Sequence, residues 1–81
     1  MKNIHPGEVL RKEFLDVLGI TPYRLSKETL IPQTALSLIL KEKRAITVKT
    51  AIKFSTYFKN TPKFWLGLQN DYDIERLTKK K

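Results

Sequence analysis

The sequence predicts a single all-α domain of five short helices. Apolar residues recur at three- and four-residue spacing, and almost no segment shows the strict alternation of a β-strand. Proline or threonine also stands at the start of each apolar run, where helices commonly begin. The chain has 81 residues, which suffice for one domain over 1–81 but not for two.

Proline opens the first two predicted helices. Pro6 suits the first helical position, because the N–H that it lacks would have no partner there. An apolar stripe then continues to Gly19, and its members are Leu10, Phe14, Val17 and Leu18. Thr21 and Pro22 repeat the arrangement as N-cap and first helical residue. We therefore expect helices over 6–18 and about 22–29.

The next two helices are predicted from the same signals. The dipeptide Ile31-Pro32 precedes a helix over about 33–40, whose apolar residues are Leu36, Ile39 and Leu40. Thr47 caps a helix over about 48–58, whose apolar face consists of Ala51, Phe54 and Phe58. The connections span only two to seven residues, so neighbouring helices must fold back against one another.

The last helix and a tail occupy 62–81. Thr61 and Pro62 open this helix, and its apolar stripe consists of Phe64, Trp65, Leu68 and Tyr72. The sequence does not define where the helix ends, because Ile74 and Leu77 extend the stripe. We expect Lys79, Lys80 and Lys81 to form a solvated tail.

The composition excludes most kinds of active site. The chain has no cysteine and one histidine, which rules out disulfides, thiolate metal sites and cysteine nucleophiles. Because no nucleophile–base pair or metal-ligand spacing is visible, we expect no enzyme activity, no metal and no cofactor. No apolar run approaches the roughly 20 residues that span a bilayer, so we expect a cytoplasmic protein that binds no membrane.

Positive charge is concentrated in one part of the chain. Sixteen Lys and Arg against eight Asp and Glu give a formal net charge of +8. Residues 41–63 contain seven of these basic residues, with Glu42 as their only acid. A basic region of this kind indicates a polyanionic partner, because each phosphate neutralised by Lys or Arg releases condensed counterions.

The second and third predicted helices form a candidate helix-turn-helix over about 21–41. In this motif the second helix enters the major groove of DNA. Its outward face here is polar and uncharged, and we predict base contacts by Gln33, Thr34 and Ser37. We predict phosphate contacts, which orient the protein on the duplex, by Thr21, Tyr23, Lys41, Lys43 and Arg44. Thr21 also serves as an N-cap, and Tyr23 has packing as an alternative role.

Two further positions are assigned from their neighbours. His5 precedes Pro6 and is predicted to cap the first helix. Trp65 belongs either to the core or to a dimer interface, and that interface would include Leu68 and Tyr72. A domain of this size reads one DNA half-site, so its function requires a homodimer.

The chain also contains several distinctive strings. They are His5-Pro6-Gly7-Glu8-x-Leu10, Tyr23-Arg24-Leu25, Lys43-Arg44-x-Ile46-Thr47, Thr50-Ala51 and Thr61-Pro62-x-Phe64-Trp65-Leu66-x-Leu68-Gln69-x-x-Tyr72-Asp73. Together they resemble the HigA family of antitoxins, also called virulence-associated-protein-I-like, of the Xre-type helix-turn-helix group. The similarity covers residues 4–77, nearly the whole chain.

This resemblance implies a five-helix, λ-repressor-like domain that dimerises and represses its own operon from a palindromic operator. It also implies a partner, a HigB-type toxin that cleaves mRNA and is neutralised by binding. Departures from the family pattern occur at Pro22, Leu30, Ala35 and Glu42. Leu30 stands where relatives usually have glycine, so a positive φ there would be strained. Two alternatives remain open: a free-standing regulator without a toxin, and a protein-interaction module whose DNA face has decayed.

Overall fold

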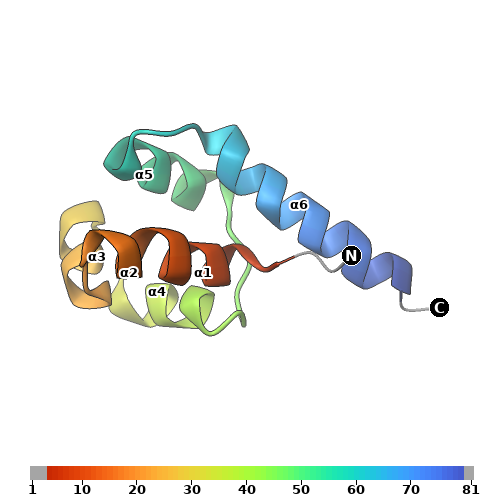
Figure 1. Cartoon of the computed structure of the whole chain (residues 1–81), viewed down its shortest axis with the longest axis horizontal. Coiled ribbons are helices and arrows are strands. Elements are labelled where there is room, and N and C mark those ends of the chain that lie inside the picture. Colours follow the sequence, from red (N-terminus) through yellow and green to blue (C-terminus); the bar gives the residue numbers. More distant parts are fainter. Residues whose placement is uncertain (1–3, 80–81) are drawn as a thin grey trace.

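The computed structural model describes residues 4–79, and every regular element in this range is a helix. The first rod, called helix one, combines α1 (Pro6–Val9), the π-helical η1 (Leu10–Leu15) and α2 (Asp16–Leu18). It is followed by α3 (Pro22–Thr29), α4 (Gln33–Leu40), α5 (Val48–Phe58) and α6 (Pro62–Lys79). The five expected helices are confirmed, and the last one continues to Lys79 (Figure 1). Lys80 and Lys81 of the expected tail lie outside the described residues.

The middle of the first rod is a π-helix, which the sequence does not predict. The backbone N–H of Asp16 donates to the carbonyl of Arg11, five residues earlier. Such a turn holds one residue more than an α-turn and shifts the side chains that follow it. Leu15 is therefore buried, whereas Val17 and Leu18 are exposed. The expected apolar stripe was wrong at these two positions.

Side chains cap the starts of four helices. Nδ1 of His5 accepts a hydrogen bond from the N–H of Gly7 at 2.8 Å, which confirms its predicted role. Oγ1 of Thr21, Thr47 and Thr61 each accepts from the N–H three residues later, at 3.1, 3.3 and 3.1 Å. A cap of this kind stabilises a helix by about 1 kcal/mol. These short contacts explain why the helix starts were predictable from the sequence.

Four helices end at a residue with positive φ, and only one of these residues is glycine. Gly19 has φ 68°, Leu30 64°, Glu42 63° and Lys59 61°. The left-handed conformation costs roughly 1–2 kcal/mol for an L residue with a side chain. The strain expected at Leu30 is therefore confirmed, and Glu42 and Lys59 share it.

Trp65 is the centre of the core. Its side chain is 0% exposed, and its ring lies 5.0 Å from Phe14 and 5.1 Å from Phe54 between ring centroids. The indole Nε1 donates to Oδ1 of Asn60 at 2.9 Å, so its polar atom is satisfied inside the chain. Trp65 thus joins η1, α5 and α6. The alternative that placed it in a dimer interface was wrong, because no part of the side chain reaches the surface.

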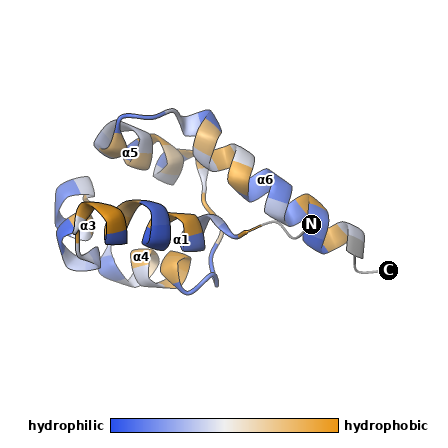
Figure 2. Cartoon of the chain, viewed as in Figure 1, coloured by the Kyte–Doolittle hydropathy of each residue, from blue (hydrophilic) through white to orange (hydrophobic). Residues whose placement is uncertain are grey.

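The bundle is elongated because α6 extends beyond the other helices. The Cα trace measures 40 × 22 × 22 Å, and α6 forms the projecting end in Figure 1. Figure 2 shows that apolar residues continue into this projecting part, where Ile74 and Leu77 are 63% and 61% exposed. None of the helices between residues 4 and 79 has both the length and the hydropathy that a membrane crossing requires.

Replacing Leu30 by glycine should raise the free energy of unfolding by about 1 kcal/mol, because the strained φ is relieved. The leucine side chain is 80% exposed, so little packing is lost. Thermal unfolding should show an increase in Tm of about 4–8 °C. Gly19→Ala is the opposite control, since no atom lies within 4 Å of the added Cβ and only the φ of 68° opposes it. A lower Tm for Leu30→Gly would contradict the strain assignment.

Candidate nucleic-acid interface

Helices α3 and α4 form the expected helix-turn-helix. The turn between them is held by Oγ of Ser26, which donates to the carbonyl of Ile31 at 2.6 Å. Oγ1 of Thr29 donates to the carbonyl of Leu25 at 2.6 Å, and Leu25 itself is fully buried. Both hydroxyls are buried and have hydrogen-bond partners, so burying them against α4 leaves no polar group unsatisfied. Because both side chains are small, α4 can pack close to α3.

A hydrogen bond between side chains also connects α3 to α5. The hydroxyl of Tyr57 donates to Oε1 of Glu28, and Nε of Arg24 pairs with Oε2 of the same carboxylate at 3.1 Å. The hydrogen bond from Tyr57, together with the one from Arg24, lowers the pKa of Glu28 below its ordinary value. The carboxylate therefore stays ionised at neutral pH and links the helix-turn-helix to the rest of the bundle.

Helix α4 has one buried face and one exposed face. Leu36 and Ile39 are each 1% exposed and belong to the core. Gln33 and Thr34 are exposed and Ser37 is half-buried, so the three predicted base-contacting residues lie on one helix away from the core. Leu38 is also exposed, which the sequence pattern does not predict. The accessible face of α4 is thus uncharged and mostly polar.

Basic residues follow directly on this face. Lys41, Lys43 and Arg44 are all exposed in the loop between α4 and α5. The loop is ordered by two backbone hydrogen bonds, from Glu42 N–H to the carbonyl of Ile39 at 3.0 Å and from Lys43 N–H to that of Leu38 at 2.8 Å. These two bonds form a Schellman motif, with Glu42 at the left-handed position usually occupied by glycine.

The other predicted phosphate contacts lie at the start of α3. Oγ1 of Thr21 is occupied as the acceptor of the N-cap hydrogen bond. Tyr23 is exposed, and Nζ of Lys27 lies 5.5 Å from its ring centroid. Thr21 is exposed as well, so both residues are accessible. They lie at the start of α3, apart in the sequence from the loop of Lys43 and Arg44.

Helix one supports the last turn of α4 at very short range. A Cβ placed on Gly7 would lie 1.9 Å from the carbonyl oxygen of Ile39, so only glycine fits at this position. One turn later, Nη1 of Arg11 donates to the carbonyl of Leu40 at 2.9 Å. The sequence gives no sign of this role for Arg11, because a contact across 29 residues leaves no local sequence pattern.

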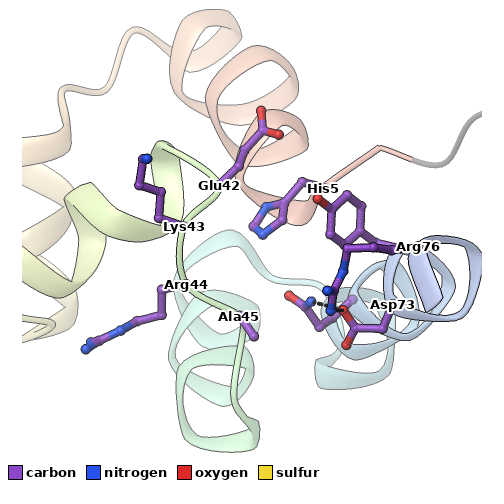
Figure 3. A pocket seen from close by; sticks show the side chains of 9 residues that line it. His5, Glu42, Lys43, Arg44, Ala45, Asp73 and Arg76 are labelled. Carbon is purple, nitrogen blue, oxygen red and sulfur yellow. Dashed lines mark hydrogen bonds and ion pairs between the residues drawn. The ribbon is translucent and has the colours of Figure 1, made fainter. Parts of the chain in front are cut away.

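A cleft of about 290 Å³ separates the basic loop from α6, and His5 lies on its wall (Figure 3). Lys43 and Arg44 extend away from His5 and Asp73, so their cations point out of the cleft. The His5 and Tyr72 rings lie edge to face, 4.8 Å apart. Burial lowers the pKa of His5 below its ordinary value, although Glu42 and Asp73 act in the opposite direction.

The residues predicted for a dimer interface lie on α6. Leu68 and Tyr72 are half-buried against the bundle, so each keeps part of its surface exposed. Ile74 and Leu77, which were not included in that prediction, are the more exposed apolar residues of this helix.

The fold and this surface define a helix-turn-helix protein, and comparisons of the chain with known proteins agree. Virulence-associated protein I of Dichelobacter nodosus is 36% identical over 75 residues, which cover 93% of this chain and 69% of the relative. The structure of an addiction module antidote protein of a HigA family from Coxiella burnetii has a TM-score of 0.92, at 40% identity, over 99% of this chain and 87% of that one.

Another solved structure, the Pseudomonas aeruginosa antitoxin HigA with the higBA promoter, has a TM-score of 0.91 and 34% identity. The match covers 94% of this chain and 83% of that one. No protein-family model matches the chain. The chain therefore belongs to the HigA family of helix-turn-helix antitoxins, the family of virulence-associated protein I.

Acidification should destabilise the fold through His5. Nδ1 must be unprotonated to accept the Gly7 hydrogen bond, and the pKa of the folded state is lowered. The unfolded chain therefore binds more protons below the ordinary pKa of about 6.5, so stability falls as pH drops through that value and levels off below the folded-state pKa. Urea unfolding between pH 8 and 5 measures this loss. The variant His5→Asn, which keeps a capping side chain without titrating, should lose less stability over the same range; an equal loss would contradict the assignment.

Proposed function

We propose that this protein is a DNA-binding antitoxin that represses its own operon. The observation that carries the proposal is the uncharged polar face of α4 with the cationic loop directly after it. The chain's relatives support it, because a HigA of this fold has been solved with its higBA promoter. Repression requires only occupancy of the operator, so the proposed activity involves no catalysis, no metal and no cofactor. We also propose a cytoplasmic location, where a protein that represses its own operon would act.

The two groups of residues have different tasks in this proposal. Gln33, Thr34 and Ser37 contact base edges in the major groove, where amide and hydroxyl groups discriminate between base pairs. Lys41, Lys43 and Arg44 contact phosphates beside the groove, and Thr21 and Tyr23 contact phosphates at the start of α3. Phosphate contacts fix the register of the protein but carry no sequence information. Specificity and affinity therefore come from different side chains.

A homodimer completes the proposed binding unit. The projecting part of α6 exposes Ile74 and Leu77, with Leu68 and Tyr72 half-exposed along the same helix. Pairing of α6 with that of a second copy would remove this apolar surface from water. Two α4 helices related by a two-fold axis then read the two halves of a palindromic operator.

Single substitutions should separate the two tasks. Gln33→Ala should weaken binding to the operator by about 1–3 kcal/mol and leave binding to a random duplex unchanged. Lys43→Ala should weaken binding to both duplexes and reduce the slope of log K against log salt by about one unit. Fluorescence anisotropy over a series of salt concentrations measures both quantities. Lys12→Ala is a charge-matched control, because Lys12 lies on helix one and pairs with Glu8. Equal effects of Gln33→Ala on both duplexes would refute base readout.

The antitoxin half of the proposal predicts rescue of growth. Expression of a neighbouring RelE-type ribonuclease should arrest growth, and co-expression of this protein should restore it, because the antitoxin neutralises the toxin by binding. The two proteins should also purify as a complex. The double variant Gln33→Ala and Lys43→Ala should rescue equally well if toxin binding is independent of DNA binding. Arrest that persists despite folded antitoxin would favour a free-standing regulator.

A further inference from the structure

The last turn of α4 contains carbonyl groups that the helix itself does not satisfy. Three of these carbonyls accept hydrogen bonds from the backbone that follows the helix. The N–H groups of Lys41, Glu42 and Lys43 donate to the carbonyls of Ser37, Ile39 and Leu38, in that order. The fourth carbonyl, that of Leu40, accepts from Nη1 of Arg11 at 2.9 Å. The end of α4 is thus tied to helix one by a charged hydrogen bond, which is stronger than one between neutral groups.

Arg11 also lies beside the proposed DNA-binding face. It lines a groove of about 420 Å³ together with Gln33, Ser37 and Lys41. Arg11 is half-buried and lies where the bundle meets the side chains proposed to contact bases and phosphate. Its backbone carbonyl also accepts the π-helical hydrogen bond from the N–H of Asp16, so Arg11 lies within η1.

Base readout requires that α4 be held in a fixed position, so the hydrogen bond from Arg11 to Leu40 is important. Polar contacts to base edges require side chains held within about 0.5 Å of their productive positions. Helix α4 has only two turns, and a helix of this length is not stable without external contacts. Its C-terminal turn leads directly into Lys41 and the loop of Lys43 and Arg44. A shift of this turn would displace base and phosphate contacts together.

We propose that Arg11 is a positioning residue for operator recognition, acting through the Leu40 carbonyl to fix the last turn of α4. This inference rests on the proposed DNA-binding function. Arg11 does not itself contact DNA in this role. Its loss should therefore reduce specific binding by the folded protein without changing the number of phosphates that the protein neutralises.

The test compares Arg11→Met with Lys12→Met. Both variants remove one positive charge from adjacent residues of helix one, but only Arg11 donates to α4. Each full-length variant is titrated against operator and random duplexes at several salt concentrations, after circular dichroism has shown that it is folded. Relative to Lys12→Met, Arg11→Met should bind the operator about tenfold more weakly, with the same affinity for random DNA and the same salt slope. Arg11→Lys should recover part of the loss, because an ammonium group also donates to a carbonyl.

Hydrogen exchange gives a second readout. It can be measured on the milder Arg11→Lys variant if Arg11→Met does not fold. The amides of Glu42 and Lys43, which close the last turn, should lose protection relative to the amide of Leu36 near the start of α4. A uniform change along α4 would overturn the proposal.

Two binding results would also overturn the proposal. If Arg11→Met binds the operator as tightly as Lys12→Met, the hydrogen bond to Leu40 does not position α4. If the salt slope of Arg11→Met is lower by about one unit, Arg11 contacts phosphate directly. Failure of the wild-type protein to prefer the operator over random DNA is a distinct result. It would overturn the proposed function and this inference with it.

Discussion

The structure depends on the packing of helix one against α4. Eight residues make α4 too short to be stable alone, so its existence and its orientation come from tertiary contacts. Leu36 and Ile39 supply the buried face, and Gly7 allows the backbone of helix one to meet the carbonyl of Ile39. The contact fixes the last turn of α4, and with it the direction in which the basic loop leaves the helix. Burial of one face also determines which side chains remain accessible on the other.

The accessible surface separates charge from polarity. A net charge of +8 attracts polyanions of any sequence, but the exposed face of α4 contributes none of it. The cations gather in the following loop, where Lys43 and Arg44 extend away from the cleft beside α6. Glu42 accepts a strained left-handed conformation in this loop, which shows that the turn geometry is maintained even without glycine. In our account, charge gives affinity and the neutral face gives specificity.

Much of the fold could be predicted from the sequence because its signals are local. Thr21, Thr47 and Thr61 each bond to a backbone N–H three residues later, so the sequence alone places the helix starts. The π-turn could not be predicted, because the burial of Leu15 in place of Val17 depends on packing. The ambiguity of Trp65 was resolved only by its neighbours on η1 and α5. Helix periodicity and charge predicted the residues that we propose to contact bases and phosphates. The hydrogen bond of Arg11 spans 29 residues and has no local sequence signature.

Chemical footprinting on the operator tests the proposed mode of DNA binding. In the proposed complex, two α4 helices, carried by a dimer, occupy successive major grooves. This arrangement should give two patches of protected guanine N7, about 34–36 Å apart on one face of the duplex, each flanked by protected backbone. Protection confined to the minor groove, or spread evenly along the duplex without half-sites, would contradict it.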